Sequence, residues 1–145
     1  MKGLLKHSVF RNFGTFLLKN ARVVNPDLSF ISDVLLEDGK IAALSHNLSH
    51  KTATVIDCTG KMVIPGGIDT HTHMQLPFMG TYAKDDFNTG TKAALAGGTT
   101  SFLDFAIPNK GQSLTEAFDL WRSWADPQVN CDYGLHVAIT DWKDN

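Results

Sequence analysis

Residues 65–73, Pro-Gly-Gly-Ile-Asp-Thr-His-Thr-His, carry the strongest structural signal in this chain. With the apolar residues before them, they predict a buried β-strand over Met62–Thr70 that leads directly into two histidines. Alternate side chains of an extended strand share one face, so His71 and His73 project together, with backbones about 6.5–7 Å apart. Two imidazoles at this spacing can each bind one zinc ion at about 2.0–2.1 Å. We therefore predict that His71 and His73 are metal ligands.

Other polar residues are weaker candidates for this site. Asp69 lies on the predicted face of the histidines and could orient a metal ligand. Asp104, late in a second predicted strand, either lines the site or forms a structural pair. His136 lies inside a third predicted strand, where a hydrogen-bonded core histidine is favoured over a ligand. The other histidines lie in polar or terminal segments and are expected to be solvated: His7, His46 and His50.

Strands and helices alternate after residue 60. Besides Met62–Thr70, the sequence predicts strands over Thr99–Ile107 and Tyr133–Thr140 and helices over Asp85–Ala96 and Ser113–Ala125. The second helix opens with Ser-x-x-Glu, a capping box. Short apolar strands that alternate with helices indicate βαβ units and a parallel sheet. The strands start about 35 residues apart, and eight such units would need roughly 280 residues, close to a full (β/α)8 barrel.

The histidine pair lies at the C-terminal end of the first strand in this alternating region. This is the end at which (β/α)8 enzymes collect their active-site residues. The apolar loop Met74–Ala83 follows directly and either forms a wall of a substrate pocket or packs the loop onto the barrel. A zinc site normally has three or four protein ligands, so two histidines do not complete one.

Before residue 60 the sequence predicts a β-rich module. Thr15–Val24 is expected to form a strand, and Asn25-Pro26-Asp27 a turn. Val34–Glu37 and Lys40–Leu44 flank Asp38-Gly39, a pair typical of a type I′ hairpin turn. Two further short strands are expected: Ala53–Cys58 and Lys61–Ile64.

The composition is that of an ordinary globular chain, with 145 residues, 43% hydrophobic and 19% charged. The length suits one average domain and excludes a complete (β/α)8 barrel, which needs roughly 250 residues. The formal net charge of -2 provides no global basic field, so we expect no nucleic-acid partner. No apolar run reaches about 18 residues, so we expect no membrane partner.

The cysteines and the N-terminal residues indicate the cellular compartment in which the protein is expected to reside. Cys58 and Cys131 form neither a CxxC pair nor a disulfide framework, and we expect both to be small buried side chains in a reducing compartment. The basic residues 1–14 could begin a transit peptide, but their low arginine and serine content favours an N-terminal extension. Without a clear secretory signal, the expected location is cytoplasmic.

Several longer motifs extend the argument beyond the histidine pair. Residues 65–73 continue into Met-Gln-Leu-Pro-Phe-Met-Gly at 74–80. Later stretches are Gly-Thr-Lys-Ala-Ala-Leu-Ala-Gly-Gly-Thr-Thr, Asp-Phe-Ala-Ile-Pro, Trp-Arg-Ser-Trp-Ala-Asp and Cys-Asp-Tyr-Gly-Leu-His-Val-Ala-Ile-Thr, at residues 90–100, 104–108, 121–126 and 131–140. Together they resemble the dihydropyrimidinase/hydantoinase family of the amidohydrolase superfamily. The resemblance covers about Thr15 to Thr140, nearly the whole chain.

This resemblance implies an α/β fold that is the start of a TIM-like (β/α)8 metal-dependent hydrolase barrel, preceded by part of a small β-sandwich domain. Residues 1–14 would be an N-terminal extension and 15–61 the partial β-sandwich domain. Residues 62–145 would be the first three strands and two helices of an incomplete barrel. The chain is then an N-terminal fragment, and we expect it to fold poorly alone because its last strand edge is unpaired.

The resemblance also implies a zinc-dependent cyclic amidase that opens 5,6-dihydropyrimidine or hydantoin rings in pyrimidine degradation. The family uses two zinc ions per complete subunit, and His71 and His73 match the two histidines on the first zinc. A bridging carbamylated lysine, two further histidines, an aspartate and a tyrosine are expected beyond residue 145, so no catalytic residue is assigned here. The implied partners are a small cyclic amide substrate and, in the complete protein, other subunits of a homotetramer.

Three alternatives remain open. One is a collapsin-response mediator protein, an adaptor that shares this fold but lacks the metal ligands; the histidine pair argues against it. Another is a different cyclic amidase, such as allantoinase or dihydroorotase. The third is a non-catalytic, dihydropyrimidinase-like fragment with weak metal binding at most.

Overall fold

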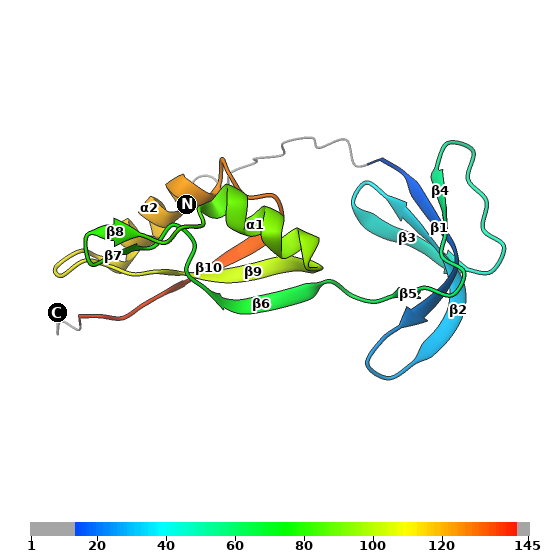
Figure 1. Cartoon of the computed structure of the whole chain (residues 1–145), viewed down its shortest axis with the longest axis horizontal. Helices are drawn as coiled ribbons and strands as arrows, with labels where there is room; N and C mark the ends of the chain where they lie inside the picture. Colours follow the sequence, from blue (N-terminus) through cyan, green and yellow to red (C-terminus); the bar gives the residue numbers. More distant parts are fainter. Residues whose placement is uncertain (1–13, 142–145) are drawn as a thin grey trace, which may run out of the picture. The chain divides into compact units, whose positions relative to one another are not determined.

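The computed structural model describes residues 14–141, which form two compact units divided between Pro65 and Gly66 (Figure 1). Of the expected extension 1–14, only residue 14 lies among the described residues. The first unit contains strands and no helix within its described part, whereas the second combines strands with two helices. The chain is thus a mixed α/β protein with few helices.

The first unit is a five-stranded sheet built around β1 (Phe16–Val24). β1 pairs antiparallel with β2 (Ser29–Glu37) and parallel with both β4 (Thr54–Asp57) and β5 (Met62–Val63), while β2 pairs antiparallel with β3 (Lys40–Ser45). The predicted hairpin is confirmed, because Asp38 and Gly39 both have positive φ angles, 50° and 72°. The buried apolar residues of the unit come mostly from β1 and β2: Leu17, Ala21, Val23, Val34 and Cys58.

A buried carboxylate ties β1, β2 and the loop after β3 together. Asp33 is only 3% exposed and accepts hydrogen bonds from the Lys19 ammonium and from the backbone N–H groups of Asn20 and Leu48. It lies beside a β-bulge, where the pairing of β1 with β2 shifts between Leu18 and Ala21. The hydrogen bond from Lys19 holds the pKa of Asp33 below its usual range, against the opposing effect of burial.

The predicted strand Met62–Thr70 is in fact two strands in different sheets. Met62–Val63 forms β5 in the first unit, and Gly67–Thr72 forms β6 in the second. Pro65 lies in the interruption and has no N–H group to donate to a ladder, which favours a break at this point. The residues that were expected to start one domain therefore span the junction between two units.

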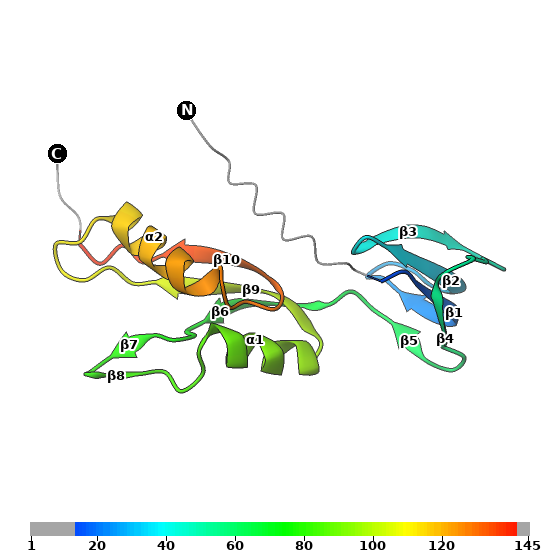
Figure 2. The ribbon, with the colours of Figure 1, turned by 90° about the horizontal axis from the view of Figure 1, so that it is seen from above.

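The second unit contains a parallel three-stranded sheet whose spatial order follows the sequence. β9 (Thr99–Ala106) is the middle strand, flanked by β6 and by β10 (Asp132–Val137). Helix α1 (Phe87–Ala96) connects β6 to β9, and helix α2 (Leu114–Ala125) connects β9 to β10. These elements confirm the predicted alternation, although β10 ends at Val137 rather than at residue 140. A small hairpin, β7 (Pro77–Phe78) with β8 (Thr81–Tyr82), follows β6 (Figure 2).

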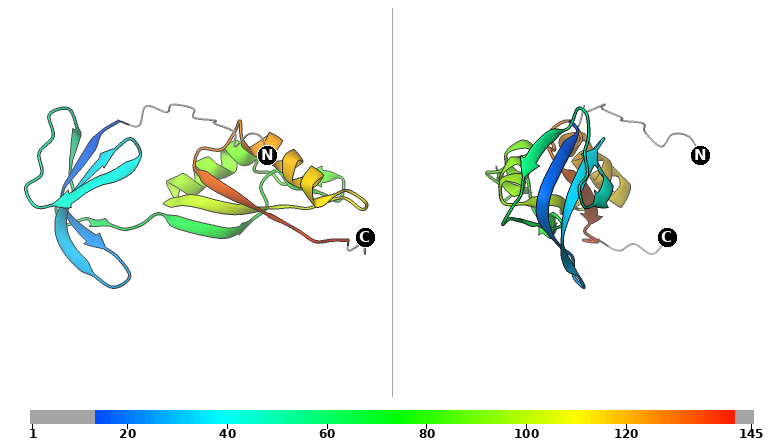
Figure 3. Two further views of the ribbon diagram at one scale, coloured as in Figure 1. Left: turned by 180° about the vertical axis from the view of Figure 1, so that it is seen from behind. Right: turned by 90° about the vertical axis from the view of Figure 1, so that its right-hand side faces the viewer.

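Both helices cover the same face of this sheet (Figure 3). Phe87 of α1 and Trp121 of α2 join Phe102 and Ala106 of β9 in one buried cluster. Burial alternates along β9, with Phe102, Asp104 and Ala106 buried and the residues between them only partly buried. The opposite face of the sheet carries no helix within the described chain.

Each helix begins with a capping box. Ser113 and Glu116 cap α2 as predicted, and Asp86 and Thr89 cap α1 in the same reciprocal way. The box at α1 was not predicted, because its third residue is threonine rather than the more usual glutamate or glutamine.

We expect Asp33→Asn to lower the free energy of unfolding by about 2–3 kcal/mol at pH 7, because the amide cannot accept all the hydrogen bonds that the carboxylate accepts. The pKa of Asp33 is depressed in the folded state, so this stabilisation exists above the ordinary carboxyl pKa. It is lost as the pH falls through the folded pKa. Urea unfolding of the parent and of Asp33→Asn between pH 7 and pH 3 measures the difference between their free energies of unfolding. This difference should become smaller as the pH falls. Asp27→Asn, at an exposed aspartate in the turn between β1 and β2, is the control and should have little effect.

We expect Gly66→Ala to be strongly destabilising, because an added Cβ would lie 2.0 Å from Thr100 Oγ1 and 2.7 Å from Thr100 Cβ. Overpacking of this kind costs about 1–3 kcal/mol. Thermal unfolding should show a loss of stability for Gly66→Ala and partial recovery in the double variant Gly66→Ala/Thr100→Gly. Gly97→Ala should show no comparable loss of stability. The last position is a matched control, since its Cβ would meet only ordinary contacts of 3.5 Å or more. Equal stability of the two alanine variants would contradict the prediction.

Candidate metal centre

The two predicted metal ligands come together at the C-terminal end of β6. His71 lies in the strand and His73 directly follows it, and both side chains are exposed in the described structure. Their Nε2 atoms are 3.2 Å apart, and their ring planes are nearly perpendicular, at 84°. The alternation of side chains along the strand thus brings two imidazole nitrogens to one point, as the sequence predicts.

This separation fits two ligands of one metal ion. Two nitrogens bound to a tetrahedral zinc at about 2.0–2.1 Å lie roughly 3.3 Å apart, close to the 3.2 Å between the Nε2 atoms of His71 and His73. Within residues 14–141, no cluster of three or more histidine, cysteine, aspartate or glutamate side chains is arranged to hold a metal. The described chain therefore brings together two nitrogen donors, fewer than the three or four protein ligands of a complete zinc site.

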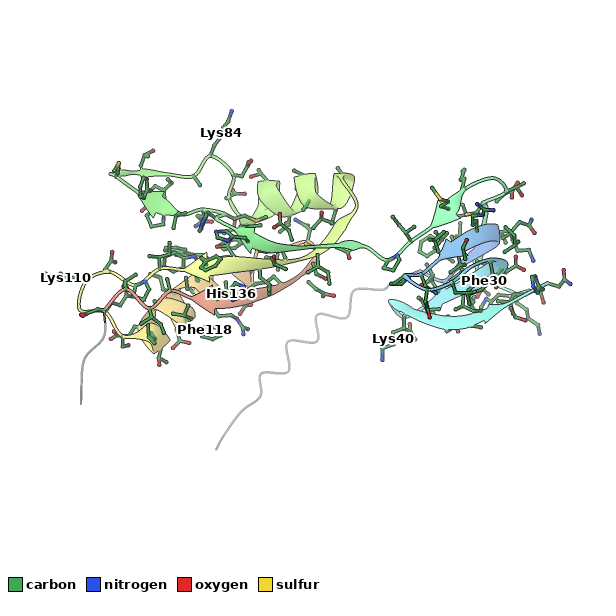
Figure 4. The ribbon with its side chains drawn as sticks, turned by 90° about the horizontal axis from the view of Figure 1, so that it is seen from below. Phe30, Lys40, Lys84, Lys110, Phe118 and His136 are labelled. Atoms are coloured by element: carbon green, nitrogen blue, oxygen red, sulfur yellow. The ribbon has the colours of Figure 1, made fainter. Side chains whose placement is uncertain are left out.

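Phe105 of β9 lies next to both imidazoles. The centre of its ring is 4.5 Å from that of His71 and 5.5 Å from that of His73. On its other side it contacts His136 of β10, at 4.9 Å. The three histidines therefore surround one aromatic ring on the face of the sheet that the helices leave open. Figure 4 shows the unit from below, with His136 labelled.

The interpretation of His136 as a hydrogen-bonded core residue is wrong for the described structure. The residue pairs with Phe105 in the β10–β9 ladder but points to the open face, where it is exposed. The sequence indicates a buried position because the neighbouring Leu135 and Val137 are apolar, and these two residues do pack against the core cluster. The strand is apolar on its helix-facing side, and His136 lies on the other.

Asp69 acts on the backbone rather than on an imidazole ring. Its Oδ1 accepts a hydrogen bond of 3.1 Å from the backbone N–H of His71. The expected role, orientation of a metal ligand, therefore remains a prediction, and the contact that the structure provides for it is with the backbone of His71. Through this contact Asp69 holds the local conformation of the strand two residues before His71, near the end of β6 at which the imidazoles meet.

Asp104 is buried on the helix-facing side of β9, opposite the imidazoles. Its Oδ2 accepts hydrogen bonds of 2.8 Å from the hydroxyl of Thr72 and from the backbone N–H of Met74. Its Oδ1 accepts a third, also 2.8 Å, from the backbone N–H of Phe105. Burial raises the pKa of the Asp104 carboxyl above its usual range, although these three hydrogen bonds oppose the shift. Of the two roles left open, the structure favours the structural one, because the carboxylate turns away from the rings.

The loop after the histidines divides into a buried start and an exposed end. Met74 is buried and packs closely on α1, where a Cβ added to Gly90 would lie 2.8 Å from its sulfur. In the β7–β8 hairpin, by contrast, Phe78 and Tyr82 are more than 60% exposed, and Met79 is 89% exposed. The first part therefore packs onto the unit, while the hairpin presents apolar side chains to solvent in the described structure.

The two cysteines differ in environment. Cys58 is buried, as predicted, whereas Cys131 is only partly buried. Burial is nevertheless the main cause that raises the pKa of the Cys131 thiol, so its thiolate form is disfavoured. Neither cysteine forms a disulfide among the described residues.

Comparison with known proteins shows what this chain is similar to. The Amidohydrolase family model matches residues 62–129. The chain is 59% identical over 133 residues to a dihydropyrimidinase from Rattus norvegicus, covering 88% of this chain and 26% of that protein. It is also 50% identical over 127 residues to dihydropyrimidinase-related protein 5 from the same organism, covering 87% and 22%. A crystal structure of D-hydantoinase superposes with a TM-score of 0.86 at 44% identity, covering 90% of this chain and 28% of that structure.

The chain spans about a quarter of the length of these relatives. In the part of the chain that the structure describes, neither helix is long and apolar enough to span a membrane. High sequence identity and close superposition extend over nearly nine-tenths of the chain. The chain is therefore a homologue of the dihydropyrimidinases and D-hydantoinases and matches the N-terminal part of these proteins.

Proposed function

We propose that this chain contributes the first two zinc ligands, His71 and His73, to a metal-dependent hydrolase of cyclic amides. The single observation that carries the proposal is the 3.2 Å separation of their Nε2 atoms at the C-terminal end of β6. This position is where (β/α)8 enzymes place their chemistry. When bound, zinc would supply a Lewis acid and an activated water for attack on an amide carbonyl.

We further propose that the second unit is the beginning of a TIM-like (β/α)8 barrel. Its strand order, β6–β9–β10, follows the sequence, and both helices lie on one face. Doubly wound sheets instead place helices on both faces and reverse the strand order at a switch point. In a closed barrel the open face would become the interior, so the imidazoles would point inward from a strand end.

The first unit is proposed to be part of a small β-sandwich domain. Its sheet exposes large apolar side chains on several strands, among them Ile41 at 65%, Val55 at 59% and Met62 at 69%. Exposed apolar groups of this kind favour a surface that further chain or a partner covers. The proposed assembly, a homotetramer of the complete protein in the cytoplasm, rests on family resemblance alone.

The proposed substrates are 5,6-dihydropyrimidines and hydantoins, rings whose amide carbonyl a zinc-activated water can attack. The names dihydropyrimidinase and D-hydantoinase, borne by relatives, support this class. In the chain itself, the two imidazoles would hold the metal, while Asp69 keeps the backbone of His71 in place. A second zinc and a bridging carbamylated lysine, as in the family, would complete the centre with residues from outside this chain.

A non-catalytic role is the second candidate, since dihydropyrimidinase-related protein 5 is 50% identical to this chain. Identity at that level does not by itself separate an enzyme from a related protein with another role. The histidine pair favours the enzyme, because an adaptor needs no converging imidazoles. Zinc binding therefore distinguishes the enzyme from a related protein that lacks the metal ligands.

We expect the 145-residue chain to bind zinc through its two imidazoles. Isothermal titration of the metal-free chain with zinc should give a binding isotherm that weakens at least tenfold in His71→Ala and in His73→Ala, because each removes half of the ligand pair. His136→Ala is the matched control: it removes an exposed histidine on the same face that makes no contact with the Nε2 pair other than through Phe105. Equal affinity in all four proteins would contradict the proposed site.

We expect the zinc-loaded 145-residue chain not to hydrolyse 5,6-dihydrouracil, because its described residues supply two ligands where catalytic zinc sites have three. Loss of absorbance by the dihydropyrimidine ring measures the reaction, with zinc alone and His71→Ala as blanks. Turnover above both blanks would contradict the expectation. A longer chain that adds a lysine, two histidines and an aspartate in frame is expected to be active.

A further inference from the structure

We propose that Asp104 and Phe105, two consecutive residues of β9, are positioning residues for the His71–His73 pair. Asp104 would fix the backbone of the metal-binding segment from the helix side of the sheet, and Phe105 would fix the imidazoles from the open side. The inference rests on the proposed function, since it concerns the same metal site.

The need for an anchor comes from the pairing of β6 with β9. Asp69 pairs with Phe102, but the next pair is Thr72 with Asp104, so three steps along β6 match two along β9. The regular ladder is therefore interrupted beside His71, at the place where the metal-binding segment must be held. A bulge of this kind leaves a residue unpaired and bends the strand.

Asp104 supplies the hydrogen bonds at this interruption. Its Oδ2 accepts from the hydroxyl of Thr72 and from the N–H of Met74, the residues on either side of His73. Its Oδ1 accepts from the N–H of Phe105, so the same carboxylate is itself held rigid against β9. The side chain thus bridges two strands and clamps both neighbours of one proposed metal ligand.

Burying the Asp104 carboxylate on the apolar side of β9 costs free energy, which indicates that this side chain has a role besides packing. Asp104 is fully buried, on the face where its neighbours Phe102 and Ala106 join the apolar core. None of the ion pairs among residues 14–141 involves it, and hydrogen bonds from neutral donors are the main compensation for its burial. An apolar side chain would satisfy the core at lower cost. It would leave the Met74 N–H and the Thr72 hydroxyl without this acceptor.

Phe105 restrains the other end of the same histidines. Both imidazoles are exposed, and an exposed side chain would otherwise move among its rotamers. The ring of Phe105 lies within 4.5 Å of His71 and 5.5 Å of His73, centre to centre, and thereby limits the orientations in which the two Nε2 atoms meet. Metal sites gain affinity when their ligands are held in place before binding.

The test is a zinc titration of the metal-free 145-residue chain and its variants by calorimetry. Asp104→Asn and Phe105→Leu should each weaken zinc binding about tenfold, the lower end of the effect known for residues that orient metal ligands. Thr72→Val keeps the shape of the side chain, removes one of the three hydrogen bonds and should weaken binding less. This milder variant, with Phe105→Leu, keeps the proposal testable if Asp104→Asn does not fold.

Two matched controls separate positioning from general loss of stability. Asp33→Asn removes the other buried carboxylate, in the first unit, and Phe118→Leu removes a phenylalanine of α2 on the far side of the sheet, where it lies near Arg122. Both should leave zinc affinity unchanged. Side-chain ¹H–¹⁵N spectra of the metal-free proteins give a second readout. The imidazole signals of His71 and His73 should shift in Asp104→Asn and Phe105→Leu and stay in place in the controls.

The outcomes distinguish the inference from the function on which it rests. If the parent binds zinc through the histidine pair and the Asp104 and Phe105 variants bind equally well, the positioning roles are wrong and the metal site stands. If the parent binds zinc no better than the double variant His71→Ala/His73→Ala, the metal site is wrong and the inference is overturned with it. Weaker binding in the β9 variants alone, with unchanged controls, supports both.

Discussion

The alternation of side chains along β9 is the constraint on which the second unit depends. Because successive residues of a strand point to opposite faces, Phe102 and Ala106 reach the helices while Phe105 reaches the open face. β9 is also the middle strand and is paired on both edges. Its register therefore sets which residues of β6 and of β10 lie beside each other across it. If the register of β9 shifted by one residue, Phe102 and Ala106 would face the open side of the sheet and Phe105 would face the helices.

The two faces of the sheet therefore have different physical roles. On the helix side, Phe87 and Trp121 exclude water and make the burial of Asp104 costly unless its oxygens are hydrogen-bonded. On the open side, the imidazoles are accessible, as metal ligands must be before they bind. The end of β6 at His71 contributes side chains to both faces of the sheet. The packing of the helix side therefore affects the backbone that carries the imidazoles on the open side.

Local periodicity explains which features the sequence predicts. The convergence of His71 and His73 requires only two-residue alternation within one strand, and the helix begun by Ser113 requires only a four-residue cap. The break at Pro65 depends on which sheet each half of the segment joins. The contacts of Asp104 with Thr72 and of Phe105 with the imidazoles depend on the register between strands about thirty residues apart, including a bulge. No pattern in a single segment contains that register.

The capping boxes and the strand order together indicate the order in which the elements of the second unit can fold. Each helix closes its first turn with residues three apart in the sequence, so its start can form without distant contacts. Each new strand then adds beside the one that precedes it, separated by a single helix. Such a sheet can grow in the direction of synthesis, one βα unit after another as the nascent chain leaves the ribosome, with the newest strand always forming the growing edge.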